Sequence, residues 1–271
     1  MTDYTVDELI SVCISRQVED GETLAQGINT PLVMAGFVLA QMTHAPNVNF
    51  ASAIGQSVCQ EPAALGVGRI EDFWLTKGLI YTGFVSASAD LLPKFKPKEF
   101  LRPAQIDQRG NTNNIAFGEH FDRPRMRLPG TGGIPDVTPM GEHLCLYVPR
   151  HSKVTFVQKL DFVSGMGYVP ERKRGAGPRY LVSDLGEFDW ANGNMRLIRT
   201  FPGVTVEQIR KKTGFELEVA SDLTETHPPS AEEVRLLRDV IDPLGVRKLE
   251  MLGGSARKDL LREILLKENA L

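Results

Sequence analysis

Apolar residues near the start of the chain recur at helical spacing. They are Val6, Leu9, Ile10, Cys13 and Ile14. Thr5 and Glu8 form a capping-box pair in front of them, which predicts a helix that ends by Gly21. Cys13 lies on the apolar stripe of this helix, so we expect its thiol to be part of the core.

The next elements alternate between strand and helix. Residues 24–28 predict a strand, and Pro31 then occupies the first position of a helix over residues 32–42. That helix is apolar on nearly every side and should be buried. Residues 48–53 predict the following strand. A β-α-β order within the first 55 residues indicates a parallel sheet with covering helices.

The second half of the chain is richer in strand patterns. Residues 107–110 read as a turn between two strands, and Asn192-Gly193 is a strong hairpin signal. The strands predicted around these turns are 143–148, 154–163, 180–183, 187–190 and 195–201. We therefore predict an α/β fold with an open, mostly parallel sheet, covering helices and a β-rich second half.

Capping residues predict three helices near the end of the chain. Thr205 begins a short one, and Ser230 with Glu233 begins another that ends before Pro243. After Gly253-Gly254 a last amphipathic helix follows. We expect one α/β domain over residues 1–250 and a C-terminal helical tail over residues 251–271, which docks either on this chain or on a partner.

The amino-acid composition indicates what kind of protein this is and which partners are not expected. Of the 271 residues, 42% are hydrophobic and 24% are charged, as in ordinary globular proteins. The formal net charge of −3 gives no reason to expect nucleic acid or an anionic membrane as partner. No apolar run is long enough for a membrane span, and no secretory signal opens the sequence. The three widely spaced cysteines favour reduced thiols, so we expect a cytoplasmic protein.

One glycine-rich stretch, Gly130-Thr-Gly-Gly133, is flanked by Pro129 and Pro135 between apolar runs. Glycine allows positive φ and a close approach to the backbone, so such a loop can present several N–H donors to an oxyanion or a phosphate. The alternative is a tight connection between two strands.

No familiar catalytic or metal motif is present. The sequence lacks the nucleophile elbow, the phosphate-binding P-loop, the zinc-binding His-Glu-x-x-His pattern and the dinucleotide-binding glycine pattern. The five histidines have no metal-ligand spacing and are expected in loops or at the surface: His44, His120, His143, His151 and His227. We expect no metal and no bound cofactor.

A series of short stretches in one order gives the sequence a recognisable resemblance. They are Glu19-Asp-Gly21, His44-Ala-Pro46, Ala104-Gln-Ile-Asp107, Gly110-Asn-Thr-Asn113, Gly130-Thr-Gly-Gly133, Val157-Gln-Lys-Leu-Asp161, Pro202-Gly-Val204, Thr213-Gly-Phe215 and Ile241-Asp-Pro243. With these, the chain resembles β subunits of family I CoA-transferases, most closely those of the glutaconate CoA-transferase type. The resemblance runs from the first helix to about residue 245.

The resemblance implies an open α/β fold and an α subunit as partner, usually in an α2β2 assembly. The acyl-CoA site of such enzymes lies between the two subunits, and coenzyme A enters as part of the substrate. The resemblance assigns Gly130, Gly132 and Gly133 as backbone donors near the thioester carbonyl. It also places three amide side chains near the active site, Gln105, Asn111 and Asn113, whose alternative role is to hydrogen-bond their own turn.

The sequence departs from the family at the catalytic position. In the transferases a glutamate on the strand after the Ala-Pro turn attacks the thioester and then carries CoA. The family spacing places Ala53 at this position, beside Ser52, while Gly55 matches the glycine of the motif. A methyl group cannot attack a thioester, so the covalent route lacks its nucleophile.

Neighbouring residues offer weak substitutes. Ser52 has no base to activate it. Cys59, expected in the loop beyond the strand, is either a catalytic thiol or an apolar core residue, and Glu61 is either catalytic or a solvated carboxylate.

Two clusters of basic residues could bind the phosphate groups of CoA. Arg123, Arg125 and Arg127 alternate along one segment, and Arg172-Lys-Arg174 lies in an expected loop. Of these we include Arg127 among the expected CoA-binding residues. Each cluster could equally be a solvated basic face.

Three functional hypotheses remain. The first is an enzyme subunit that, with its α partner, cleaves a C–C bond hydrolytically in an acyl-CoA or decarboxylates it. The resemblance supports it, because relatives without the glutamate open a steroid-derived ring or decarboxylate 3-methylglutaconyl-CoA. The second is a true CoA-transferase that obtains its carboxylate from elsewhere. The third is a catalytically silent subunit that shapes the site of its partner.

Overall fold

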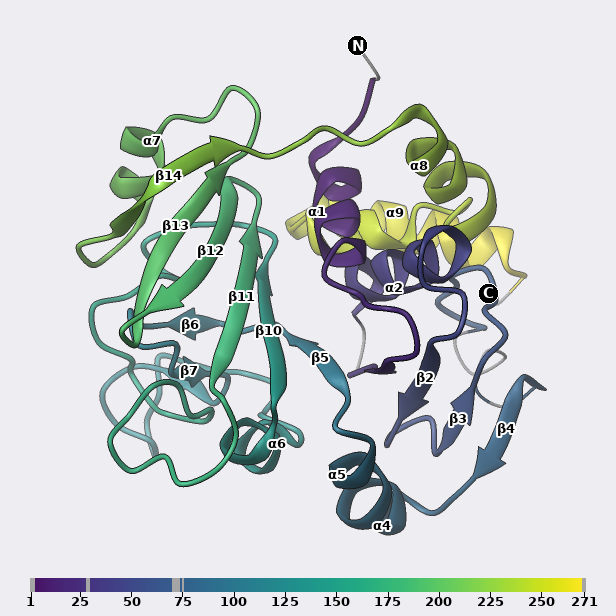
Figure 1. Ribbon diagram of the computed structural model, residues 1–271, viewed down its shortest axis with the longest axis horizontal. Coiled ribbons are helices and arrows are strands. Elements are labelled where there is room, and N and C mark those ends of the chain that lie inside the picture. The colour runs from purple at the N-terminus through teal and green to yellow at the C-terminus, as the bar shows by residue number, and fades with distance from the viewer. Residues whose placement is uncertain (1–2, 28–29, 70–73, 75, 270–271) are drawn as a thin grey trace. The chain divides into compact units, whose positions relative to one another are not determined.

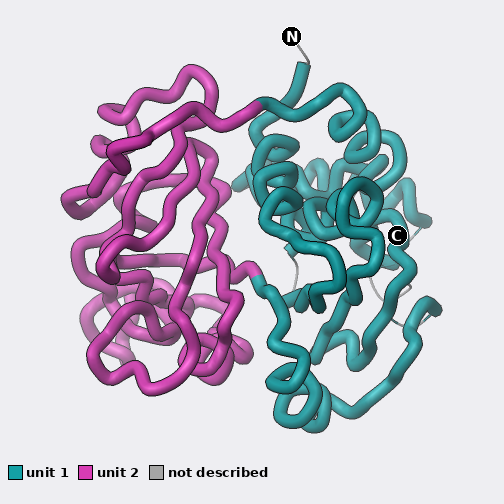
Figure 2. The backbone as a smooth tube through the Cα atoms, in the orientation of Figure 1, with its two compact units in different colours: residues 1–99, 228–271 teal, residues 100–227 magenta. Residues whose placement is uncertain are grey.

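The computed structural model contains both helices and strands, and in several places strands follow one another directly along the chain (Figure 1). It describes residues 3–27, 30–69, 74 and 76–269. Two compact units divide the chain: unit 1 comprises residues 1–99 and 228–271, and unit 2 comprises residues 100–227 (Figure 2). The division at residue 250 expected from sequence is not found, because the last residues fold together with the first hundred.

Two buried helices follow the predicted starts. α1 (Val6–Ser15) begins at the capping box, where the Thr5 backbone N–H donates to Glu8 Oε2 over 2.8 Å. α2 (Pro31–Thr43) has proline at its first position and is buried through its first ten residues. Residues 28 and 29, which the pattern assigned to a strand end and a helix start, lie outside the described residues.

Close contact between α1 and α2 depends on one glycine. A Cβ atom on Gly36 would lie 2.6 Å from the carbonyl oxygen of Ser11 and 2.7 Å from a methyl group of Ile14. Any larger residue would push the two helices apart. Ser11 Oγ in turn donates to the Leu32 carbonyl oxygen over 3.3 Å, which ties α1 to the start of α2.

The sheet of unit 1 has the order β5-β1-β2-β3-β4. β1 (Thr23–Ala25) pairs in parallel with β2 (Asn49–Ser52) and with β5 (Lys98–Leu101). β3 (Ser57–Cys59) and β4 (Gly78–Tyr81) extend it as antiparallel strands. The predicted β-α-β unit is confirmed as β1, α2 and β2.

A helical run follows β4. It consists of α4 (Phe84–Ser86), a π-helical turn η1 (Ala87–Leu91) and α5 (Leu92–Phe95). Lys96 ends it in the left-handed conformation, with φ of 46°.

The C-terminal residues return to unit 1 as four helical segments. They are α8 (Ala231–Arg235), the π-helical η2 (Leu236–Ile241), the 3-10 helix η3 (Val246–Glu250) and α9 (Gly254–Lys267). The tail docks on this chain: Ile264 of α9 is buried against Val246 and Leu249. Both Glu268 carboxylate oxygens accept backbone N–H groups, from Val67 and Gly68.

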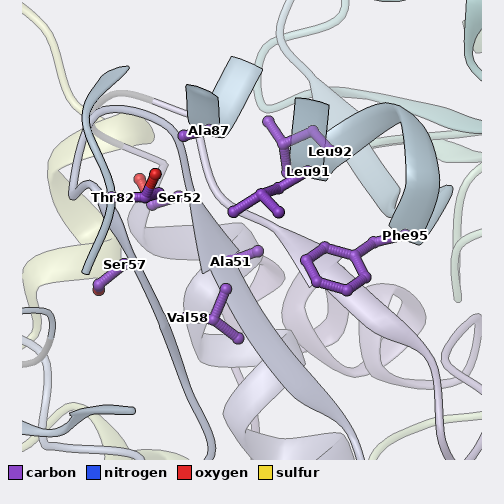
Figure 3. Close-up of a pocket in the computed structure, with 9 residues that line it drawn as sticks. All are labelled: Ala51, Ser52, Ser57, Val58, Thr82, Ala87, Leu91, Leu92 and Phe95. Atoms are coloured by element: carbon purple, nitrogen blue, oxygen red, sulfur yellow. The ribbon is translucent and has the colours of Figure 1, made fainter. Parts of the chain in front are cut away.

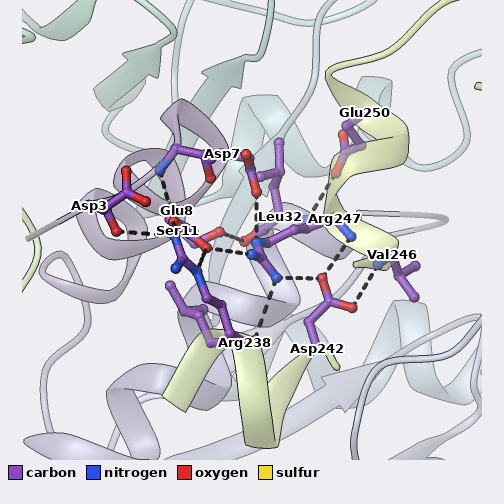
Figure 4. Close-up of polar contacts among 12 residues, drawn as sticks. Asp3, Asp7, Glu8, Ser11, Leu32, Arg238, Asp242, Val246, Arg247 and Glu250 are labelled. Carbon is purple, nitrogen blue, oxygen red and sulfur yellow. Dashed lines mark hydrogen bonds and ion pairs between the residues drawn. The ribbon is translucent and has the colours of Figure 1, made fainter. Parts of the chain in front are cut away.

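A buried ionic cluster joins the two ends of unit 1 (Figure 4). Arg247 is 1% exposed and lies 2.8 Å from Asp7, 2.9 Å from Glu8 and 2.8 Å from Asp242. Arg238 also contacts Glu8, at 2.7 Å. We name these five side chains the Arg247 cluster. A buried guanidinium needs such partners, because an uncompensated charge away from water is strongly unfavourable.

Unit 2 contains a five-stranded mixed sheet in the order β14-β13-β12-β11-β10. Its strands are β10 (His143–Val148), β11 (Pro178–Ser183), β12 (Gly186–Ala191), β13 (Asn194–Thr200) and β14 (Glu218–Glu225). The Asn192-Gly193 hairpin is confirmed, with φ of 52° and 76° at its two central residues. The expected α/β class with a β-rich second half is also confirmed.

Short elements complete unit 2. Hairpins form between β6 (Gln105–Ile106) and β7 (Thr112–Asn113) and between β8 (Ala116–Phe117) and β9 (Met126–Arg127). The helices are α6 (Ile134–Met140) and α7 (Val206–Lys212), and Thr205 caps the latter as predicted.

The sequence predicted one strand that does not form, and some of the observed strands were not predicted. Residues 154–163 form turns with a single bridge, Phe156 to Ile106, instead of a strand. Phe156 and Leu160 are buried whereas Val154 and Val163 are exposed, so burial there does not follow the period of a strand. Conversely, β14 was missed, because most of its side chains are exposed and polar.

One histidine expected in a loop or at the surface is buried. His151 stacks on Phe156 with ring centroids 3.6 Å apart, and its ring nitrogens contact the hydroxyls of Ser183 and Thr213. Burial lowers the pKa of His151 to about 3. The imidazole is therefore neutral and structural.

Candidate active site

The position at which the resemblance places a glutamate lies in the turn between β2 and β3. Ser52 ends β2 directly opposite Ser57, the first residue of β3, and residues 53–56 connect them. Ala53 is the first residue of this turn and is partly buried. The other three residues of the turn are Ile54, Gly55 and Gln56, so the turn carries no acidic side chain.

Ser52 and Gly55 hold the turn in shape. Ser52 Oγ accepts the Gly55 N–H over 2.9 Å and donates to the Gln26 carbonyl oxygen over 3.4 Å. A Cβ atom on Gly55 would lie 2.6 Å from the indole of Trp74, so only glycine admits that ring. These contacts give both residues a structural role, and contact with substrate stays a prediction for them.

A small pocket borders the turn (Figure 3). Ala51 and Val58 form one wall, and Leu91, Leu92 and Phe95 from η1 and α5 form another. The space measures about 210 Å³ with its opening to solvent included. Its lining is mainly apolar, which suits a hydrocarbon group rather than a charged one.

Neither neighbouring substitute for the glutamate has the required chemistry. Cys59 does not lie in a loop as expected: it is buried in β3, and burial raises the pKa of its thiol to about 12. It is therefore a protonated core residue. Glu61 is exposed and forms a 2.7 Å ion pair with Lys77, whose hydrogen bond and charge lower the pKa of Glu61.

Sequence reasoning missed one carboxyl group. Glu99 in β5 pairs with Ala25 of β1, and burial raises its pKa to about 7. A carboxyl group that titrates near neutral pH can donate or accept a proton under working conditions. The only sequence signal was a charged pair, Lys98-Glu99, directly before the apolar residues Phe100 and Leu101.

The glycine-rich loop of unit 2 lies exposed before α6. Among the described residues, no acceptor is found for the N–H groups of residues 130–133, whereas those of Asp136 and Val137 bind the Gly133 carbonyl oxygen. Gly130 has φ of +115° and Gly132 has φ of +53°, and no atom lies within 4 Å of a Cβ built on either. Backbone conformation, rather than crowding, therefore requires these glycines, and their N–H groups remain open to a ligand.

The amide residues of the second motif serve the framework of unit 2. Asn113 is fully buried, and its Nδ2 donates to Gln105 Oε1 over 2.7 Å and to the Ala116 carbonyl oxygen over 2.8 Å. Gln105 Oε1 also accepts the Asp161 N–H. These bonds fix the β6–β7 hairpin on its neighbouring loop.

Asn111 has a similar role at the tip of the same hairpin. Its Nδ2 donates to Asp107 Oδ2 over 2.9 Å, and its Oδ1 accepts the Gly167 N–H over 2.8 Å. The contacts of all three amides are structural, but they reach beyond their own turn to Asp161 and Gly167, and contact with substrate stays a prediction for them.

The two arginine clusters differ in how far their side chains are already engaged by other groups of the chain. Arg172 donates to the carbonyl oxygens of Thr138, Met166, Gly167 and Arg174, so it braces the loop internally. Arg127 is exposed, stacks over the Phe121 ring at 4.6 Å and donates to its carbonyl oxygen. Arg123 and Arg125 are also exposed, which leaves this segment the better candidate for contact with phosphate.

Other classes of site were sought across the described ranges. No group of three His, Cys, Asp or Glu residues within them is placed to hold a metal ion. None of the helices seen there is sufficiently long and apolar to cross a membrane. All three cysteines are buried thiols.

Known proteins are similar to this chain in sequence and in fold. Residues 100–212 match the family model of coenzyme A transferases. The chain is 29% identical to one subunit of a 3-oxoadipate CoA-transferase from Pseudomonas knackmussii, over 88% of this chain and 94% of that one. It is also 29% identical to the IpdB subunit of a cholesterol ring-cleaving hydrolase from Mycobacterium bovis, over 90% and 97% of the two chains.

A solved structure has the same fold. The crystal structure of the decarboxylase AibA/AibB superposes with a TM-score of 0.79 at 28% identity, covering 91% of this chain and 98% of that one. Transferase, hydrolase and decarboxylase subunits thus share this architecture at nearly equal identity. Residues 100–212 thus match the coenzyme A transferase family, and over most of its length the chain is similar to β subunits of transferases, hydrolases and decarboxylases that act on acyl-CoA.

Proposed function

We propose that this chain is the β subunit of a two-subunit enzyme that hydrolytically cleaves or decarboxylates an acyl-CoA, without forming a covalent CoA intermediate. The observation that carries the proposal is that the β2–β3 turn, residues 53–56, holds no acidic side chain, and the resemblance assigns Ala53 to the position of the nucleophilic glutamate. The buried Cys59 and the ion-paired Glu61 provide no substitute. Loss of the only nucleophile slows a covalent route by many orders of magnitude.

The glycine-rich loop supports chemistry that needs no nucleophile from this chain. Hydrolytic C–C cleavage and decarboxylation both develop negative charge on an oxygen next to the thioester. The four consecutive N–H groups of residues 130–133, which have no acceptor within the described part of the chain, can stabilise such an oxyanion. The similar proteins named as a ring-cleaving hydrolase and a decarboxylase support the same choice.

A companion subunit is part of the proposal. The similar proteins are named as subunits or solved as two-part enzymes, which supports an α subunit and an α2β2 assembly. Five large apolar side chains in β4 and α4 are 50–75% exposed: Leu79, Ile80, Tyr81, Phe84 and Val85. Contiguous exposed apolar surface of this kind is typical of a subunit interface.

We further propose that the enzyme needs no cofactor beyond the coenzyme A of its substrate. A reducing compartment such as the cytoplasm is consistent with three buried thiols.

The proposal can be tested by a substitution that introduces a carboxylate at position 53. In the complex with the α subunit, Ala53→Glu supplies a carboxylate that attacks the thioester carbonyl and expels CoA thiolate, which forms a mixed anhydride. The thiolate then attacks the glutamyl carbonyl and releases the acyl carboxylate. We expect intact-mass spectrometry to detect the resulting glutamyl-CoA thioester in Ala53→Glu but not in the unmodified chain or in Ala53→Gln.

The unmodified complex should instead release cleaved or decarboxylated product from a panel of β-keto and glutaconyl-type CoA esters. A borohydride-sensitive CoA adduct on the unmodified chain would contradict the proposal. That result would favour a true transferase that uses a carboxylate from elsewhere.

A further inference from the structure

One carboxyl group of unit 1 lies on the same face of the sheet as the strand residues that line the pocket of Figure 3. Ala25 of β1 is paired with Ala51 of β2 on one side and with Glu99 of β5 on the other. Residues paired in this way project to the same face of a sheet. Ala51 lines the pocket, and so does its partner in β3, Val58. These four side chains therefore form one row across four strands.

The row leaves space between Glu99 and the pocket. Neighbouring strands lie about 4.8 Å apart, so the Cα atoms of Glu99 and Ala51 are about 10 Å apart. Ala25 stands between them in the row, and its methyl group occupies little of the space above the sheet. On the other side, Phe95 of the pocket wall ends α5 directly before the segment that leads into β5. The Glu99 carboxyl group can therefore reach the edge of the pocket beside Ala51.

The Glu99 carboxyl group has no partner within the described part of the chain. Its neighbour Lys98 projects to the opposite face and is bound there to Glu22 at 2.6 Å, whereas Glu99 has no such hydrogen bond or ion pair among the described residues. The Glu99 side chain is partly buried, and burial rather than a neighbouring charge raises its pKa to about 7. A carboxyl group held without a partner in such surroundings is unfavourable for folding, which suggests a functional reason.

The proposed reaction needs a proton close to this row. Ala51 precedes Ala53 in sequence by two residues, so the row passes beside the β2–β3 turn. When a C–C bond next to the thioester breaks, its electron pair remains on the acyl chain as an enolate, and carbon must then receive a proton. Backbone N–H groups can stabilise the enolate oxygen but are too weakly acidic to supply that proton.

We propose that Glu99 is the acid that protonates C2 of the acyl chain, the carbon next to the thioester carbonyl, after the C–C bond has broken. The Glu99 O–H bond breaks, the electron pair of the enolate forms a C–H bond with the proton, and the thioester carbonyl is restored. The Glu99 carboxylate then takes a proton from water before the next turnover. This assignment rests on the proposed function, since it names the residue for the last step of that reaction.

Hydrogen exchange tests the assignment without C–C cleavage. In the reverse direction the ionised carboxylate must remove a C2 proton from a bound thioester. Butyryl-CoA is the probe, because it has neither a carboxylate to lose nor a β-keto group to cleave. In D2O the complex with the α subunit should place deuterium at C2 of butyryl-CoA, at a rate that rises as pH passes through about 7. Mass spectrometry of butyryl-CoA measures the deuterium content.

Variants assign the exchange to Glu99. Glu99→Gln should slow it about 100-fold or more and remove its rise near neutral pH, while butyryl-CoA affinity stays unchanged. Glu99→Asp should restore part of the rate, because it returns a carboxyl group on a shorter side chain. Glu263→Gln, which removes an exposed carboxylate paired with Lys267, is the matched control and should exchange as the unmodified complex does. Equal rates in the unmodified complex and Glu99→Gln, or no exchange by either, would overturn the assignment.

The two proposals can fail separately. A covalent CoA adduct on the unmodified chain would defeat the proposed reaction, whereas the exchange into butyryl-CoA would be unaffected. Full cleavage or decarboxylation by Glu99→Gln would defeat the role of Glu99 but leave the proposed reaction intact.

Discussion

At the scale of single residues, glycines act in two distinct ways in this chain. Gly36 and Gly55 are required by crowding, since a Cβ atom would meet other atoms within 2.7 Å. Gly130 and Gly132 are required by conformation, since their φ values are positive and the space around them is open. The second kind leaves backbone donors accessible, as an oxyanion site needs.

Gly132→Ala should therefore impair catalysis more than folding. We expect turnover by the complex to fall about 10- to 100-fold, because the loop must shift its N–H groups or place a methyl group where the thioester binds. The stability cost should be about 1 kcal/mol. Steady-state kinetics and urea unfolding measure the two effects.

Gly203→Ala is the matched control, because Gly203 has φ of +76° and equally open surroundings but lies outside the loop. It should lose similar stability and keep full turnover. If Gly132→Ala also kept full turnover and only weakened assembly with the α subunit, the loop would be a scaffold.

Glu99 should give stability a pH dependence. Its pKa is about 7 in the folded chain against 4.5 in the unfolded chain, so the folded state retains the proton longer. The unfolding free energy should fall by about 1–3 kcal/mol as pH rises from 5 to 8. Glu99→Gln should flatten this part of the profile, as measured by urea unfolding at several pH values. An unchanged slope would show that Glu99 titrates normally.

At the scale of elements, the Arg247 cluster joins α1 to the segments η2 and η3. Arg247→Leu would leave Asp7 and Asp242 buried without their cation, and Glu8 with Arg238 alone (Figure 4). We expect a loss of about 3–5 kcal/mol in unfolding free energy. Arg235→Leu, which breaks an exposed pair with Glu232, should cost less than about 1 kcal/mol. Similar costs for the two variants would mean that the cluster adds no more than a surface pair.

At the scale of the whole molecule, the chain leaves unit 1 after residue 99, builds unit 2, and returns at residue 228. Both chain ends therefore belong to unit 1 (Figure 2). This path explains why the Arg247 cluster pairs residues about 240 positions apart. It also explains why the C-terminal helix packs on this chain.

Much of the fold could be predicted from sequence because its signals are local. The capping boxes at Thr5, Thr205 and Ser230 and the hairpin at Asn192-Gly193 lie where the pattern placed them. Each depends on a few consecutive residues whose backbone preferences decide the outcome. The resemblance to CoA-transferase β subunits could likewise be read from sequence, since it depends on short motifs in one order.

Contacts between residues far apart along the chain could not be predicted from the sequence. Burial alone made Cys59 a protonated core thiol and raised the pKa of Glu99, and both effects depend on neighbours distant along the chain. The partners of Gln105 and Asn113 came from the packing of separate loops.

By itself, then, the sequence determined the order of most elements, the resemblance to CoA-transferase β subunits and the lack of a carboxylate at residue 53. Only the tertiary structure decided which polar groups of the described residues found partners and which, like the Thr30 hydroxyl and the loop N–H groups, did not. The reason is physical: backbone preference acts over a few residues, whereas desolvation and hydrogen bonding depend on everything folded around a group.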